Sequence, residues 1–365
     1  MSISVRKLNA DTTFLFTFSS ETDQDSNLRV LVDPWLAGDS SWLHPAFQLS
    51  SHTVAPAISS LGELQHDIDL IIISQDKPDH CHKKTLCSWP KDRPIDIFTT
   101  PAAARKIKEW KHFDADRIHE LAPYNVADQQ SIKRILSPRG AGELSIANLA
   151  TKKDLTGLHN AIAFTYQPCK ILRSSIPPTD IALSTPPESP KLLRTPQDTL
   201  STPTLRARIR SYSSLRSMAR RPRTPIASPP HTPDDSRCMS CIYTPHGVSP
   251  SLIQPYLHYH LAASNALPLT LLVHSMVEER NPWFMGGIVA AGAPGGVELV
   301  RTLGGKVKHW VAAHDEEKDN SGVSVKMLKT QRYGMTEVQN LLAHGGYGDV
   351  KLAGLDSGEE LRMLG

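Results

Sequence analysis

A proline-rich segment in the middle of the chain limits what the rest can fold into. Residues 169–237 hold twelve prolines, many Ser and Thr, and twelve Lys or Arg against five acidic residues. Such a composition buries too little apolar area to offset the entropy lost on folding, so the segment is predicted to be disordered. The flank 1–168 ends on an apolar strand pattern and the flank 238–365 begins with another. We therefore expect one domain made of both flanks, with 169–237 as a long insertion.

The composition of the whole chain narrows the class of protein. The chain has 365 residues, 39% of them apolar, which is sufficient for a large core. A formal net charge of +3 gives no electrostatic argument for a nucleic-acid partner. Five cysteines, an odd number, are typical of free thiols in a reducing compartment, so an intracellular, cytoplasmic protein is expected. No run approaches the roughly 18 apolar residues of a membrane span, so we expect no membrane partner.

Strand patterns occur on both sides of the insertion. Thr13–Phe18 and Arg29–Val32 flank a polar turn at Glu21–Asn27, as in a β-hairpin. Leu70–Ile73 is wholly apolar and rich in β-branched residues, which is typical of a strand that is covered on both faces. Further strands are expected after the insertion, at Leu269–Val273 and Trp310–Ala313.

Helix signals alternate with these strands. Thr100 and Pro101 are typical of the N-cap and first position of a helix, and Val297–Leu303 reads as the end of another. Near the end of the chain, Thr336 and Gln339 have the spacing of a capping box. This alternation predicts an α/β fold.

The sequence after the buried strand carries the strongest chemical signal. The strand leads at once into a loop with adjacent Asp79 and His80. On a regular strand these neighbours would point to opposite faces, but Pro78 lets the chain turn and aim both inward. A carboxylate beside an imidazole is typical of half of a zinc or iron site.

This segment, Gln75-Asp76-Lys77-Pro78-Asp79-His80, resembles the first metal motif of the metallo-β-lactamase superfamily, which reads His-x-His-x-Asp-His after a buried strand. The run Leu31–Leu36, which contains Asp33-Pro34-Trp35, is similar to an early strand and turn of the branch related to the ascorbate-phosphate lactonases. Two later runs resemble strands of that family that lead to ligand histidines, here His246 and His314. The resemblance implies a four-layer αββα sandwich of metallo-β-lactamase type.

Two positions depart from the family's metal motif. Gln75 and Lys77 stand where the family has the histidines that help to hold the first metal, and a protonated lysine repels a cation. The resemblance therefore implies one ion, zinc or else iron or manganese, rather than two. The implied ligands are Asp79, His80 and His314, with His246 as a fourth ligand or as a residue that orients water. Alternatively, the Lys77 ammonium takes the place of the missing cation and polarises a substrate oxygen.

Two functions fit this sequence. One, implied by the resemblance, is a metal-dependent hydrolase that cleaves a small-molecule ester, lactone or phosphoester, with Lys77 and Asp33 as catalytic residues beside the metal. Asp33 also suits a structural role, because an Asp-Pro turn can bond its own backbone and still face a pocket. The other is a catalytically inactive protein of the same fold with a binding or regulatory role.

Weaker signals lie elsewhere. The insertion carries seven Ser-Pro or Thr-Pro pairs and a basic run at Arg206–Arg223, which fit either a kinase or docking partner or a solvated loop. Cys238 and Cys241 have metal-site spacing, but a single pair of this kind is most often coincidence. His159 is a further candidate for the metal site, since it precedes a strand near where the family can supply a middle ligand.

Overall fold

The computed structural model describes residues 1–19, 27–65, 67–137, 142–151, 153–154, 156–168 and 238–364. The predicted insertion 169–237, with its phosphorylation and docking hypotheses, lies outside the described residues, as does most of the predicted turn at Glu21–Asn27. The split into 1–168, 169–237 and 238–365 stays a prediction.

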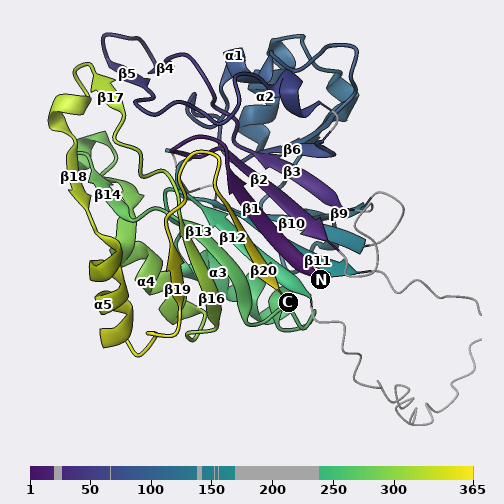
Figure 1. The fold of residues 1–365 in the computed structure, drawn as a ribbon, viewed down its shortest axis with the longest axis vertical. Coiled ribbons are helices and arrows are strands. Elements are labelled where there is room, and N and C mark those ends of the chain that lie inside the picture. The colour runs from purple at the N-terminus through teal and green to yellow at the C-terminus, as the bar shows by residue number, and fades with distance from the viewer. Residues whose placement is uncertain are drawn as a thin grey trace, which may run out of the picture. The chain divides into compact units, whose positions relative to one another are not determined.

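The first large sheet contains the hairpin and the buried strand that the sequence predicts (Figure 1). The order of its strands is β20 (Glu360–Leu364), β1 (Ser2–Lys7), β2 (Phe14–Ser19), β3 (Leu28–Val32), β6 (Leu70–Ile73), β7 (Asp96–Thr99) and β8 (Ile118–Glu120). Strands β1, β2 and β3 pair antiparallel, whereas β3, β6, β7 and β8 run parallel. The carboxyl ends of β3 and β6 therefore lie at the same edge of the sheet.

The second large sheet combines strands from both sides of 169–237. The order of its strands is β19 (Lys351–Ala353), β16 (Val307–Ala312), β13 (Leu269–His274), β12 (Met239–Thr244), β11 (Ala161–Pro168), β10 (Gly142–Leu149) and β9 (Ile132–Leu136). Strands β11 and β12 are antiparallel neighbours, with Tyr166 opposite Met239, so the chain leaves and re-enters the sheet at adjacent positions. Strands β12, β13, β16 and β19 run parallel.

The main core fills the space between the two sheets. Aromatic residues of β2 pack there against the opposite sheet, with the rings of Phe16 and Phe164 centred 5.6 Å apart and those of Phe18 and Tyr166 5.4 Å apart. Strand β6 shows why its sequence is apolar throughout. Ile72 belongs to this inner core, whereas Ile71 and Ile73 pack into a second core on the outer face of their sheet.

Helices cover the outer faces of both sheets and complete the αββα sandwich (Figure 1). The outer face of the first sheet carries α1 (Lys83–Leu86) and α2 (Pro101–Glu109), and that of the second carries α3 (Pro250–Tyr256), α4 (Gly292–Thr302) and α5 (Met335–His344). The fold class predicted from the sequence is therefore confirmed. No helix in the described ranges is both long and apolar enough to span a membrane.

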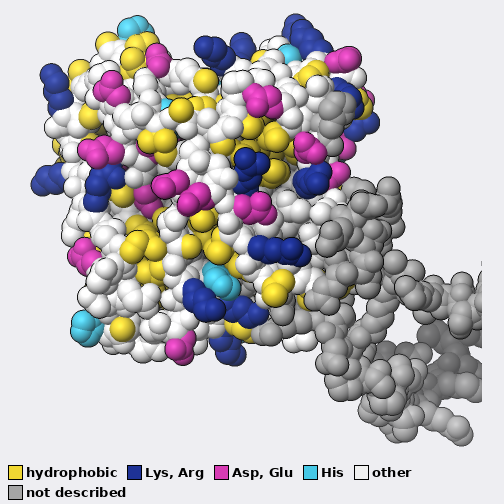
Figure 2. Space-filling view, viewed as in Figure 1, with side chains coloured by type: hydrophobic (Ala, Val, Ile, Leu, Met, Phe, Trp, Pro, Cys, Tyr) yellow, Lys and Arg dark blue, Asp and Glu magenta, His cyan; other side chains and the backbone are white. Residues whose placement is uncertain are grey.

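Two smaller sheets extend beyond the sandwich. One has the order β15 (Ile288–Ala291), β14 (Val277–Arg280), β18 (Lys329–Arg332), and the other the order β17 (Asp319–Ser321), β5 (Gln48–Ser51), β4 (Ser40–Trp42). Basic and acidic side chains are interspersed on the face shown in Figure 2, in keeping with the nearly balanced net charge.

One of the two predicted helix starts is confirmed and the other is wrong. Thr100 is the N-cap residue of α2, as expected, but its side chain makes no capping hydrogen bond. The capping box predicted at Thr336 and Gln339 is wrong, because α5 begins at Met335 after Gly334 and Thr336 lies within its first turn. A Thr and a Gln three residues apart signal a helix start only if the Thr has extended backbone, and spacing alone does not show that.

The adjacency of β11 and β12 makes the insertion hypothesis testable. Replacing residues 170–236 by a short Gly-Ser linker should leave a monomer that melts cooperatively, at or above the melting temperature of the full chain, because a shorter loop costs less closure entropy. Differential scanning calorimetry measures this. Aggregation, or loss of cooperative melting, would show that the segment contributes to the folded core.

Candidate metal centre

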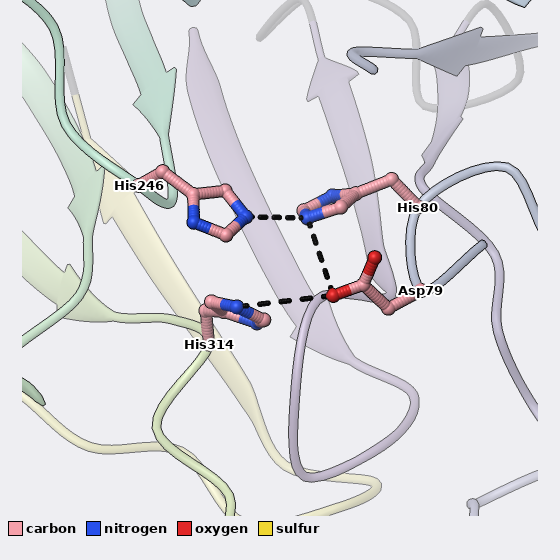
Figure 3. A group of neighbouring side chains, drawn as sticks. All are labelled: Asp79, His80, His246 and His314. Carbon is pink, nitrogen blue, oxygen red and sulfur yellow. Dashed lines mark hydrogen bonds and ion pairs between the residues drawn. The ribbon is translucent and has the colours of Figure 1, made fainter. Parts of the chain in front are cut away.

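Three histidines and one carboxylate meet at one edge of the sandwich (Figure 3). Asp79 and His80 follow β6 of the first sheet, while His246 and His314 follow β12 and β16 of the second. The edge is formed by the carboxyl ends of parallel strands from both sheets, so loops from distant parts of the chain converge there. The structure thus brings together all four residues implied as metal ligands.

The spacing of the four groups fits one metal ion. His80 Nε2 lies 2.9 Å from His246 Nε2, and Asp79 Oδ2 lies 3.9 Å from the Nε2 atoms of both His80 and His314. The potential ligand atoms all lie within 4.8 Å of one another. In a tetrahedral zinc site with ligands about 2.1 Å from the ion, ligand atoms are about 3.4 Å apart, so small side-chain shifts would complete the geometry.

Each histidine is oriented by an acceptor at its other ring nitrogen. Nδ1–H of His80 donates to Asp33 Oδ2 at 2.8 Å, Nδ1–H of His246 to the carbonyl of Val289 at 3.0 Å, and Nδ1–H of His314 to Asp11 Oδ1 at 3.0 Å. With Nδ1 occupied in this way, the Nε2 atom of each ring faces the centre of the cluster. Histidines that bind metals are typically held by such acceptors, which fix the tautomer and the ring orientation.

The electrostatics of the cluster also favour a cation. Although burial opposes it, the charges of Asp79 and Asp33 raise the pKa of His80. Burial, with the neighbouring His314 and His80, holds the pKa of His246 well below its usual range. The Nε2 atoms of His80 and His246 face each other across a 2.9 Å contact. A metal ion bound between these nitrogens and the Asp79 carboxylate would take the place of that contact.

Asp33 lies behind His80. Its carboxylate is buried and accepts hydrogen bonds from the backbone N–H of Ser74 at 2.7 Å and the hydroxyl of Tyr243 at 2.8 Å, in addition to His80. Its φ of 45° turns the chain sharply after β3 and aims the side chain at His80. The Asp-Pro turn after the strand is therefore present, and these contacts fit a residue that positions His80.

Sequence analysis missed Asp11 and Lys318. Asp11 lies in the loop after β1, and Lys318 Nζ donates to its Oδ2 at 2.9 Å. Although burial opposes it, the charges of His314 and Lys318 hold the pKa of Asp11 well below its usual range. Asp11 is 303 residues from His314 in sequence, and no local pattern marks such a pair.

A pocket opens above the cluster. Its lining includes Asp79, His246 and His314. Two lysines also line it, Lys77, which the sequence predicted, and Lys318, which it did not. The Lys77 ammonium also lies 3.3 Å from Asp76 Oδ1, so part of its charge is balanced. Lys77 thus faces the space in which a substrate would lie.

Gln75 occupies a position at which the family motif has a histidine. Its Nε2 donates to the carbonyl of Leu158 at 2.8 Å and to Asn160 Oδ1 at 3.3 Å. These bonds fix its amide nitrogen to the residues just before β11. Its Oε1 has no hydrogen-bond partner within the described part of the chain. Gln75 therefore acts as a bridge between the two sheets.

Other candidate residues lie apart from the cluster. His159, the further candidate, contacts the carbonyl of Ile288 at 3.0 Å. His82, two residues after His80 in sequence, instead caps the N-terminus of α1. Cys238 and Cys241 pack into different cores on opposite faces of the second sheet, so these two thiols cannot share an ion. The interpretation of their spacing as coincidence agrees with this geometry.

Comparisons with known proteins bear on the fold. No protein-family model matches the chain, and no curated protein matches it either. The isothiocyanate hydrolase from Delia radicum gut bacteria matches with a TM-score of 0.51 and 12% identity over 98% of each chain. A structure described as a possible metal-dependent hydrolase from Veillonella parvula matches with a TM-score of 0.50 and 11% identity over 99% of each chain. The metallo-β-lactamase-type fold implied by the sequence motifs is confirmed, and identities this low show the fold alone.

The acceptors behind the histidines give a test of the site. Asp11→Asn and Asp33→Asn should each weaken zinc binding by about 10- to 100-fold. The neutral amide lacks the negative charge of the carboxylate and forms a weaker hydrogen bond to the imidazole of His314 or His80. Isothermal titration calorimetry with zinc measures this. Asp39→Asn is the matched control, since Asp39 bonds the exposed Ser51 hydroxyl and should leave the affinity unchanged. Equal zinc affinity in all three variants would contradict the assignment.

Proposed function

We propose that this protein is a metal-dependent hydrolase that uses one zinc ion, or else iron or manganese, to cleave an ester, lactone or phosphoester. The observation that carries the proposal is the convergence of three Nε2 atoms and a carboxylate at the base of a pocket, with each imidazole fixed from behind. The proposed ligands are Asp79, His80, His246 and His314.

The bound ion would supply a Lewis acid that polarises a substrate oxygen and favours ionisation of water at neutral pH. The chain's own residues would orient the reactants. Asp79, His246 and His314 belong to the pocket lining, so a substrate in the pocket would lie against the proposed ligands. The rings stay fixed during the reaction because Asp33, Asp11 and the Val289 carbonyl hold their Nδ1–H groups.

Lys77 and Asp33 have different proposed roles. The Lys77 ammonium lines the pocket, where it would bind an anionic oxygen of the substrate and stabilise the charge that develops as the bond breaks. Asp33 is buried and reaches His80 rather than the pocket, so we assign it a positioning role in place of the catalytic role expected from the sequence.

The environment of Gln75 supports one ion rather than two. Its amide nitrogen is hydrogen-bonded to Leu158 and Asn160. The other position at which the family motif has a histidine is occupied by Lys77, which pairs with Asp76. An amide and an ammonium are poor substitutes for two imidazoles as metal ligands.

Loss of the ligands should abolish hydrolysis. His80→Ala and His314→Ala should lower kcat at least roughly 100-fold on whichever ester, lactone or phosphoester a panel identifies as substrate, because the ion is lost. Steady-state kinetics with zinc, iron or manganese measures this, and His309→Ala outside the cluster is the control. A folded, metal-loaded protein that turns over no member of the panel would favour the inactive, binding alternative.

Removal of the Lys77 charge should reduce turnover without removing the ion. Lys77→Met should lower kcat/KM about 10- to 100-fold, which corresponds to the loss of one charge-assisted hydrogen bond, and Lys77→Arg should restore part of it. Metal content, measured in parallel, should not change. Lys84→Met, at an exposed position on α1, should behave as wild type. Unchanged kinetics in Lys77→Met would exclude a catalytic role for Lys77.

A further inference from the structure

Two aromatic side chains next in sequence to the pocket lining are unusually exposed. In the 3₁₀ turn η7 (Trp283–Met285) between β14 and β15, Trp283 is 88% exposed and Phe284 is 65% exposed. The same turn contributes Met285 to the pocket lining, followed by Gly286 and Ile288. Large apolar side chains are seldom left this exposed side by side without a ligand or partner.

Further exposed apolar side chains belong to a second segment that lines the pocket and to a residue bonded to that segment. Trp42 of β4 lines the pocket, and its neighbour Leu43 is 78% exposed. Val323, also exposed, is tied to this hairpin by a hydrogen bond from its backbone N–H to the carbonyl of Ala46. Exposed apolar residues therefore occur in two segments that line the pocket and in a third segment that is bonded to one of them.

The lining of the pocket has a charged part and an apolar part. Lys77 and Lys318 add positive charge beside the proposed ligands His246 and His314, which are buried. The apolar part includes Leu158, Met285 and Leu328, which are partly buried, and Ile288, which is exposed. A charged part and an apolar part in one lining match the two ends of an amphiphilic molecule.

The size of the cavity fixes how such a molecule would lie. Its volume is about 130 Å³, below the roughly 300–1,000 Å³ of pockets that enclose a whole drug-sized ligand. A head group fits inside, and a chain attached to it must leave through the mouth. Both η7 and the Trp42–Leu43 corner border the pocket, through Met285 and Trp42.

We infer that the substrate is an amphiphile, with an anionic or strongly polar head group against Lys77 and the proposed metal centre and an alkyl or aryl chain along Trp283 and Phe284. The inference rests on the proposed function for the chemistry at the head group. The chain is recognised by burial of apolar area, which is independent of whether the bond is cleaved.

The inference is tested by binding of two alkyl phosphonates, which resist hydrolysis. Dodecylphosphonate, kept below its critical micelle concentration, should bind the full-length protein at least roughly tenfold more tightly than butylphosphonate, since burial of even two of its additional methylene groups gives that ratio. Isothermal titration calorimetry measures both. The double variant Trp283→Ala/Phe284→Ala should bring the ratio close to one and leave butylphosphonate affinity unchanged.

A matched control removes exposed apolar side chains elsewhere. Leu136 of β9 and Tyr259 of the π-helical turn η6 (Leu257–Leu261) are 64% and 66% exposed, on elements that contribute nothing to the lining of this pocket. Leu136→Ala/Tyr259→Ala should retain the wild-type preference for the long chain. Equal affinity of the two phosphonates for wild type, or an unchanged ratio in the Trp283→Ala/Phe284→Ala variant, would overturn the inference.

Further results distinguish failure of the amphiphile inference from failure of the proposed hydrolase function. If the Trp283→Ala/Phe284→Ala variant loses binding to phosphatidylcholine vesicles while its phosphonate ratio is unchanged, η7 contacts a lipid surface and the inference is wrong. If the phosphonate ratio is as expected but no ester, lactone or phosphoester is hydrolysed, the amphiphile site stands and the proposed function fails. If short and long substrates are hydrolysed equally well, the proposed function is supported and the amphiphile inference is wrong.

Discussion

The site depends on hydrogen bonds between buried carboxylates and imidazoles that are distant in sequence, 47 residues apart for Asp33 and His80 and 303 for Asp11 and His314. Asp11 and Asp33 are fully buried, and a buried carboxylate without partners costs several kcal/mol. Each is compensated by an imidazole and by further donors, Lys318 for Asp11 and Ser74 and Tyr243 for Asp33. The same bonds that offset the cost of burial also turn the Nε2 atoms toward one point.

The candidate metal centre therefore needs both sheets of the sandwich. Asp33 and His80 follow β3 and β6, which are adjacent parallel strands of the first sheet, whereas Tyr243 lies on β12 of the second sheet and His246 follows it. Tyr243 packs in the inner core and bonds Asp33, so the packing of the two sheets sets the distance between the His80 and His246 rings. Backbone geometry contributes as well, since Asp33 and His314 both adopt positive φ where their strands end.

Sequence patterns predicted the strands, the fold class and the four clustered side chains because these signals are local or carried by family motifs. The buried strand Leu70–Ile73, for example, is apolar because both of its faces are covered. The missed residues are those whose role depends on long-range contact. Asp11 and Lys318 resemble ordinary polar loop residues until the fold brings them to His314. The exposure of Trp283 was equally hidden, because a Trp in sequence is more often buried.

The central claim is that the clustered His80, His246, His314 and Asp79 hold one metal ion. Elemental mass spectrometry on the full-length protein, purified without a metal-binding tag and then incubated with zinc and desalted, tests it most directly. The account predicts about one zinc per chain in wild type and loss of that zinc in both His80→Ala and His314→Ala. Absence of bound metal from the wild-type protein, after incubation with zinc, iron or manganese in turn, would contradict it.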